Sequence, residues 1–189
     1  YRYYKKYPSR RALGFCCSRT HAEVMAAEFC RRGIPAAAVY SNADGVFSED
    51  RERAIERLER QEIRVIFSVD MFNEGLDIAS LDMVMFLRPT ESPVVFLQQL
   101  GRGLRLSEDK ECLTVLDFIG QANKKYNFED KFAALLSNTT RGVTREIKDG
   151  FISLPKGCYI QLEKKAARYI LNNIRASYGN SAGLVTRIA

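Results

Sequence analysis

Short apolar runs alternate with amphipathic stretches along the first part of the chain. Residues 12–17, 36–40, 63–69, 83–87 and 112–118 form five such runs. These runs are mostly apolar at consecutive positions, whereas a strand exposed on one side would alternate between apolar and polar residues. The pattern therefore predicts an α/β fold with a parallel sheet that carries helices on both faces.

Helices are expected between these strands. One begins near Thr20 and stops at Gly33, because apolar residues recur at helical spacing up to a glycine that can cap the last turn. Its apolar positions are Val24, Met25, Ala27, Phe29 and Cys30. A second helix is expected after Ser48, whose side chain can cap the N-terminus, with two acidic residues in the first turn. Its inner face carries Ala54, Ile55 and Leu58.

The pattern changes after about residue 120. The last helix of the alternating pattern is expected over residues 92–102, where a Ser-Pro pair opens it. Residues 128–136 and 164–175 again have helical spacing, and the stretch 142–149 between them is polar. A small α-rich extension is therefore expected to follow the sheet.

The expected division has three parts: a linker over residues 1–10, a sheet domain over 11–125 and the α-rich extension over 126–189. The linker begins with alternating tyrosines and basic residues. Such side chains can stack on nucleic-acid bases, but docking of the linker on the sheet domain is the more frequent explanation.

Composition narrows the class of protein only slightly. The 189 residues carry a net charge of +6, which suits a phosphate-rich partner but is also common elsewhere. No apolar run approaches the roughly 20 residues that a membrane span requires, so we expect no membrane and a cytoplasmic location. The five cysteines form no Cys-x-x-Cys pair and His21 is the only histidine, so no metal site is expected.

The segment QQLGRGLR contains the most specific candidate chemistry. It places Gln98, Arg102 and Arg105 at the end of a predicted helix beside two glycines. Arginine stays charged and forks onto phosphate oxygens, so both guanidinium groups can reach one triphosphate. A solvated basic helix end is the competing interpretation.

The segment FCCSR precedes the first predicted helix. Ser18 and the helix-start amides offer donors to a phosphate, with Arg19 beside them, and an ordinary cap at Ser18 is equally expected. A further hypothesis is a hydrolase with Cys16 or Cys17 as nucleophile and His21 as base. We rank it below the others because no arginine stands where a cysteine phosphatase loop would need one.

The third predicted strand leads into SVDMFNEGLDI. Ser68 and Asp70 come at the end of the strand, where parallel sheets bind ligands. Further on, Gly75 permits a close approach of the backbone, and the carboxylate of Asp77 can accept hydrogen bonds. Glu74 adjoins both. Taken alone, this stretch would be an ordinary polar loop.

These three segments, in this order and spacing, resemble the fourth, fifth and sixth motifs of superfamily 2 helicases, and in particular of bacterial restriction- and phage-defence-type members. The resemblance implies that the fold is the second, RecA-like lobe of a motor. It implies nucleic-acid contacts for Ser18, Arg19, Ser68 and Asp70, nucleotide contacts for Glu74, Gly75 and Asp77, and catalytic contacts to the triphosphate for Gln98, Arg102 and Arg105. Val69 stands where many relatives have threonine.

The sequence has no GxxxxGK[ST] loop and no Asp-Glu-x-His or Asp-Glu-Ala-Asp motif. The resemblance therefore implies that ATP with Mg²⁺ is held mainly by an N-terminal RecA-like lobe, to which residues 1–10 lead, and that this lobe is inactive alone. It implies DNA as the partner, with RNA as the other option. The alternative is a non-catalytic RecA-like adaptor that binds nucleic acid or a protein.

Overall fold

The computed structural model describes residues 1–6, 11–42, 44–71, 81–88, 112–118, 128–136, 142–154 and 160–185, with the backbone path alone for residues 135 and 177–185. The chain divides into two compact units. Unit 1 contains residues 1–90 and 98–120, and unit 2 contains residues 91–97 and 121–189. This division is close to the one expected at residue 125, and the assignment of the domains stays a prediction.

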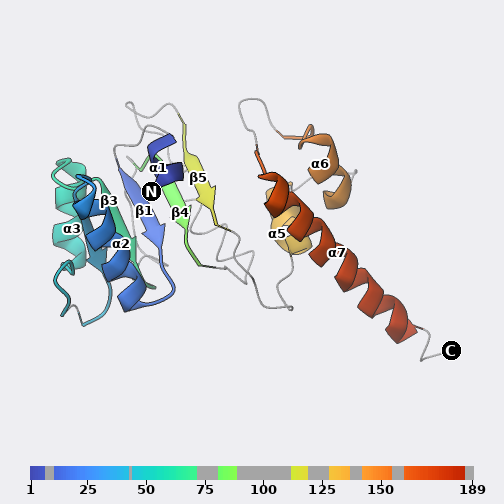
Figure 1. The fold of residues 1–189 in the computed structure, drawn as a ribbon, viewed down its shortest axis with the longest axis horizontal. Helices are drawn as coiled ribbons and strands as arrows, with labels where there is room; N and C mark the ends of the chain where they lie inside the picture. Colours follow the sequence, from blue (N-terminus) through green and yellow to red (C-terminus); the bar gives the residue numbers. More distant parts are fainter. Residues whose placement is uncertain are drawn as a thin grey trace. The chain divides into compact units, whose positions relative to one another are not determined.

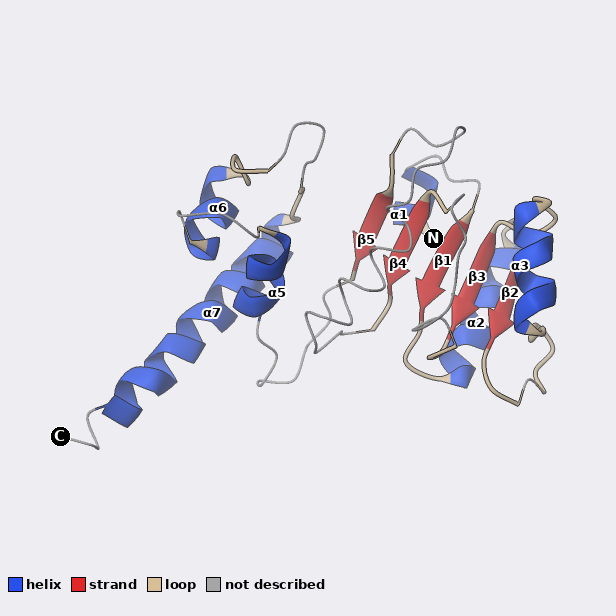
Figure 2. Ribbon diagram, turned by 180° about the vertical axis from the view of Figure 1, so that it is seen from behind, coloured by secondary structure: helices blue, strands red, loops and turns tan. Residues whose placement is uncertain are grey.

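Unit 1 is built on a five-stranded parallel sheet. Its strands are β1 (Ala12–Phe15), β2 (Ala36–Val39), β3 (Val65–Ser68), β4 (Met83–Phe86) and β5 (Thr114–Asp117). They lie in the order β2-β3-β1-β4-β5, and every neighbouring pair is parallel (Figure 2). The predicted α/β fold with a parallel sheet is confirmed. All five carboxyl ends lie at one edge of the sheet.

Two helices of unit 1 cover opposite faces of this sheet. Helix α2 (Arg19–Arg31) joins β1 to β2, and α3 (Arg51–Glu59) joins β2 back to β3. Because these crossovers run in opposite directions along the strand order, right-handed connections place the helices on opposite faces. In Figure 2, α2 lies behind the strands and α3 in front of them.

Aromatic rings fill the core between α2 and the sheet. Phe29 of α2 meets Phe67 of β3 with ring centroids 5.0 Å apart at an angle of 74°. Gly14 of β1 makes room for this pair, because a Cβ at that position would lie 2.7 Å from a carbon of the Phe67 ring. Tyr4 of α1 (Arg2–Lys6) completes the cluster, with its ring 5.1 Å from Phe29. The ring of Tyr4 is thus buried in unit 1.

The structure corrects two details of the helices in unit 1. The residues of α2 that are buried are Ala22, Ala26 and Phe29, while Val24 is 58% exposed. The cap of α3 is Asp50, whose carboxylate accepts from the amides of Glu52 and Arg53, so the prediction of Ser48 as the cap was wrong. The Ser48 hydroxyl instead donates to the carbonyl of Gly45 at 2.8 Å.

Unit 2 consists, in its described part, of three helices that pack against one another: α5 (Phe128–Leu135), α6 (Val143–Asp149) and α7 (Lys164–Val185), drawn in orange and red in Figure 1. Phe128 and Phe132 are buried there, against Tyr169 and Phe151. The α-rich character is as predicted, but α6 forms in the stretch read only as polar, and α7 continues ten residues beyond residue 175. No helix in the described residues is long and apolar enough to cross a membrane.

Candidate functional site

The carboxyl edge of the sheet in unit 1 brings together the segments that follow β1, β3 and β4. The amide of Cys16 donates to the carbonyl of Ser68 at 2.8 Å, and the amide of Leu87 donates to the carbonyl of Phe15 at 3.0 Å. The first residues after the three strands are therefore fixed next to one another. Ligands of parallel α/β sheets bind at this edge.

Ser18 begins α2 at this edge as its N-cap. Its backbone is extended, with φ −157° and ψ 162°, and its Oγ accepts a hydrogen bond from the amide of His21 at 3.1 Å. The capping role that the sequence offered for Ser18 is therefore present. It is compatible with phosphate binding, because a capped helix start still presents amides and a positive dipole end to an anion.

Arg19 projects from the first turn of α2 and is exposed. Its Nη2 donates to the hydroxyl of Ser41 at 3.3 Å, and its Cζ lies 5.7 Å from the centre of the Tyr40 ring. The two partners follow β2. Arg19 thus spans the segments after β1 and β2, which directs its positive charge along the carboxyl edge.

Tyr40 is itself fixed by a partly buried hydrogen-bond network. Its hydroxyl donates to Oε1 of Glu23 at 3.0 Å and accepts from the amide of Gly45 at 3.1 Å. Burial raises the pKa of the Tyr40 hydroxyl, which therefore stays protonated at neutral pH. The guanidinium group of Arg19 therefore lies over a neutral ring whose position is fixed by hydrogen bonds. The sequence alone did not predict this contact.

Ser68 is the last residue of β3 and is only 1% exposed. The sheet register places it beside Phe15 on one side and Val39 on the other. Its hydroxyl has no hydrogen-bond partner in the part of the chain that the structure describes. A nucleic-acid strand outside the protein could reach this hydroxyl only if neighbouring residues moved, so the contact assigned to Ser68 stays a prediction.

Asp70 and Arg88 form an ion pair at the same edge. Asp70 has φ +54°, in the left-handed region that few residues other than glycine adopt, and its side chain is 62% exposed. Nη1 of Arg88 lies 2.7 Å from its Oδ1, and the Arg88 side chain is 19% exposed. Sequence reasoning missed Arg88. A basic residue two positions after β4 was the available signal.

Cysteines 16 and 17 occupy different environments. Burial raises the pKa of the Cys16 thiol to about 12, so Cys16 is a thiol at neutral pH and unsuited to nucleophilic catalysis. Sγ of the exposed Cys17 lies 3.2 Å from Nδ1 of His21, and the amide of Cys17 donates to the same nitrogen at 3.4 Å. Burial lowers the pKa of His21. Nδ1 is therefore an acceptor, and the imidazole is neutral.

Several predicted site residues lie outside the described residues: Glu74, Gly75, Asp77, Gln98, Arg102 and Arg105. The described site residues do not all meet in one place by direct contact. Instead, Ser18 with Arg19 and Asp70 with Arg88 form two polar groups after neighbouring strands of the sheet. The described part of the chain contains no group of three or more His, Cys, Asp or Glu side chains that could hold a metal ion.

A parallel sheet with helices on both faces and polar side chains at its carboxyl edge defines an α/β lobe of the kind that binds ligands at that edge. Residues 1–107 match the family model described as the helicase conserved C-terminal domain. The chain belongs to this family, and it is a C-terminal RecA-like lobe of the superfamily 2 helicase type, as the motif resemblance predicted.

Individual relatives of this chain are also named as helicases. A Saccharomyces cerevisiae protein named as a candidate ATP-dependent helicase, IRC3, is 30% identical over 111 residues, which are 59% of this chain and 16% of that protein. A Methanocaldococcus jannaschii protein named as a candidate ATP-dependent RNA helicase, MJ1505, is 29% identical over 126 residues, or 65% of this chain and 16% of that protein. The chain thus spans about a sixth of the length of these relatives.

One solved structure has the same fold. The C-terminal domain of the DEAD-box protein Dbp5 superposes with a TM-score of 0.54 at 14% sequence identity, over 72% of this chain and 72% of that one. At this identity the likeness concerns the fold alone.

Proposed function

We propose that this chain is the second motor lobe of an ATP-dependent DNA helicase or translocase of the restriction- or phage-defence type. In this proposal it supplies Arg102 and Arg105 to an ATP that an N-terminal RecA-like lobe mainly holds, and it forms part of the nucleic-acid groove. The lobe does not hydrolyse ATP alone. The four cysteines among the described residues are free thiols, which suits a reducing compartment, and the cytoplasm is the proposed location.

The observation that supports this proposal most is the carboxyl edge of the sheet. Arg19 and Arg88 direct guanidinium groups to the edge at which α/β sheets bind ligands, and both are fixed there by neighbouring side chains. Guanidinium groups bind phosphate oxygens with two parallel hydrogen bonds. The exposed guanidinium of Arg19 suits a phosphate backbone, while that of Arg88 is held in its ion pair with Asp70.

The proposed division of labour follows the strand ends. Ser18 and Arg19 contact the backbone of the nucleic acid, and the segment after β3, with Asp70, lies along the same path. Glu74, Gly75 and Asp77 approach the nucleotide, and Gln98 adjoins the two arginines. Binding of ATP between the two lobes draws them together, and hydrolysis lets them part. The residues that hold the phosphate backbone therefore advance along the nucleic acid.

The Mg²⁺ that accompanies ATP is assigned to the N-terminal lobe. The described residues offer cations and hydroxyls at the carboxyl edge but no cluster of metal ligands. These side chains suit the phosphate oxygens of a nucleotide or a nucleic acid. In this proposal the metal supplies charge neutralisation for the phosphates, and the residues of this lobe position the triphosphate and the strand.

The test is an Arg105→Ala substitution in the full-length protein. Loss of a guanidinium that stabilises the transferring phosphoryl group lowers the rate by roughly 10³-fold or more. Nucleic-acid-stimulated ATPase activity should therefore fall to background, while DNA affinity measured without ATP should remain within about twofold, since this arginine is not among the proposed strand contacts.

Arg31→Ala is the matched control. Arg31 is an exposed arginine in the last turn of α2, at the opposite end of that helix from Arg19, and it pairs with Glu28. This variant should keep normal turnover. Wild-type ATPase activity in Arg105→Ala would refute the proposal. Stimulation of the ATPase activity by RNA but not by DNA would mean that the substrate is RNA. The archaeal relative is named as a candidate RNA helicase.

A further inference from the structure

Most of the exposed residues in the part of α7 whose side chains are described, residues 164–176, are basic and lie on one side of the helix. Lys165, Arg168, Asn172 and Arg175 are all exposed and follow one another at spacings of three, four and three residues. This spacing places them on a single face of an α-helix. We call these four residues, with Lys164 at their N-terminal end, the α7 stripe.

The opposite face of α7 is already occupied within unit 2. Ile170 and Ile174 are 0% and 1% exposed, and the ring of Tyr169 meets Phe128 with centroids 5.8 Å apart. A basic amphipathic helix can insert its apolar face into a membrane or into a partner's groove. Among residues 164–176 of α7, whose side chains the structure describes, that face is buried against α5 and α6, and the α7 stripe faces away from them.

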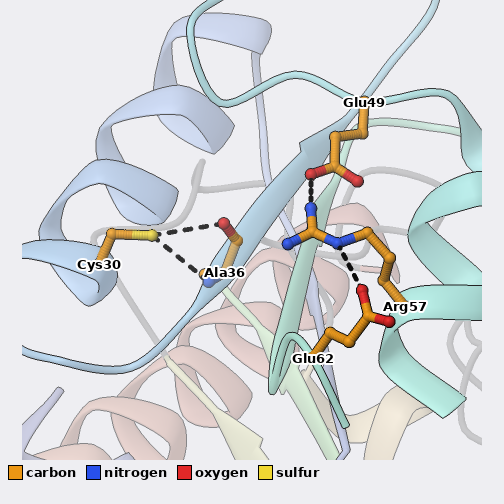
Figure 3. Close-up of polar contacts among 5 residues, drawn as sticks. All are labelled: Cys30, Ala36, Glu49, Arg57 and Glu62. Atoms are coloured by element: carbon orange, nitrogen blue, oxygen red, sulfur yellow. Dashed lines mark hydrogen bonds and ion pairs between the residues drawn. The ribbon is translucent and has the colours of Figure 1, made fainter. Parts of the chain in front are cut away.

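The cations of the stripe have no acidic partner among the described residues, whereas several arginines of unit 1 do. Figure 3 shows Arg57 of α3 between Glu49 and Glu62, and Arg31 of α2 pairs with Glu28. By comparison, the cations of the α7 stripe make no ion pair with any other described residue, and the sequence of α7 contains no Asp or Glu over its 22 residues. An ordinary solvated helix face mixes the two signs of charge.

The position of the lysines also disfavours a purely structural role. Lys164 and Lys165 lie in the first turn of α7, and the one acidic residue at this helix start is Glu163, directly before them. The N-terminal end of a helix carries a partial positive charge, so cations there are unfavourable to the helix itself. A polyanion bound along the stripe would remove both this repulsion and the repulsion between the cations.

We propose that the α7 stripe is a second nucleic-acid contact of this protein, which binds the phosphate backbone without reading sequence. From Lys165 to Arg175 the stripe extends about 15 Å at a rise of about 1.5 Å per residue. A DNA strand carries a phosphate about every 3.4 Å along its axis, so the three cations on this face can each meet a phosphate. The proposal concerns unit 2 and does not depend on what Arg102 and Arg105 do at ATP.

The experiment measures binding of a fluorescent 20-nucleotide DNA, as single strand and as duplex, by the intact protein without ATP at several salt concentrations. The test variant combines Lys165→Gln, Arg168→Gln and Arg175→Gln. Each lost phosphate contact lowers the slope of log affinity against log salt by about 0.7 for single strands and 0.9 for duplex. The slope should therefore decrease by about 2 to 3, and the affinity at low salt should fall at least tenfold.

The control variant combines Arg31→Gln, Arg60→Gln and Arg64→Gln, which removes the same net charge from exposed residues at the amino edge of the sheet. It should leave the slope unchanged. A second test variant, Lys165→Arg, keeps the charge and should bind like the wild type. Circular dichroism melts of all variants establish that α7 remains folded, since only solvent-facing atoms change.

Two results would refute nucleic-acid binding by the α7 stripe, and a third would assign the stripe to another partner. One is an unchanged slope in the triple α7 variant with its melt intact. The other is equal loss of affinity in the control variant, which would mean that net charge and not the stripe matters. Competition by polyglutamate as effective as that by unlabelled DNA of equal charge would reassign the stripe to an acidic protein partner. Loss of stimulated ATPase in Arg105→Ala with normal DNA binding would leave this proposal untouched.

Discussion

Replacement of Ser68 by alanine should stabilise the protein. The Ser68 hydroxyl is 1% exposed and has no hydrogen-bond partner among the described residues. A buried polar group without a partner costs about 1–3 kcal/mol, because it has lost its water and gained nothing. Alanine removes the hydroxyl and leaves only a small void between Phe15 and Val39. The net gain in the free energy of unfolding should be about 1 kcal/mol, or about 4 °C in Tm for a domain of this size.

Urea unfolding followed by circular dichroism measures this change. The matched control is Ser48→Ala, because the Ser48 hydroxyl does have a partner, the carbonyl of Gly45 at 2.8 Å. That variant should lose about 1 kcal/mol, so the same substitution should have opposite signs at the two serines. A destabilised Ser68→Ala would refute the reasoning and would mean that the hydroxyl is satisfied in the folded state.

Ser68→Ala also separates stability from function. Natural proteins keep unsatisfied buried groups mainly where a ligand or another conformation uses them. If the proposed nucleic-acid contact of Ser68 forms when the lobes close, the more stable variant should have lower nucleic-acid-stimulated ATPase activity in the full-length protein. Unchanged activity would remove Ser68 from the set of nucleic-acid contacts and leave its burial as a packing feature.

Two further predictions concern the same edge. Burial lowers the pKa of His21, so the unfolded state binds the proton more readily, and the free energy of unfolding should fall as the pH decreases below the usual histidine pKa of about 6.5. His21→Gln should therefore lose less stability than the wild type between pH 7.5 and 5.5. Equal losses of the two proteins in urea titrations would contradict this prediction. Arg88→Gln should lower the free energy of unfolding by at most about 1 kcal/mol, because its partner Asp70 is 62% exposed to solvent. A double-mutant cycle with Asp70→Asn measures the coupling between the two side chains, and a coupling energy above about 2 kcal/mol would contradict this prediction.

The sequence by itself determined the local elements and the family. Consecutive apolar residues were enough to locate β1 to β4, because a strand buried on both faces has no polar side to alternate with. The order of the motifs was enough for the helicase C-terminal family, since the motifs depend on residue type and spacing along the chain. Strand β5 was also found, although its exposure alternates in the described structure and Val115 is 36% exposed.

Only the tertiary structure decided which residues meet. Neither the exposure of Val24 nor the choice of Asp50 over Ser48 as a cap follows from periodicity, because both depend on how the helix approaches the sheet. The pairing of Asp70 with Arg88 joins residues 18 positions apart, which become neighbours only when β3 and β4 take their places on either side of β1. The order of the strands in the sheet is set by how whole elements pack against one another. The pattern of a single sequence predicts each strand or helix but not which other elements lie beside it.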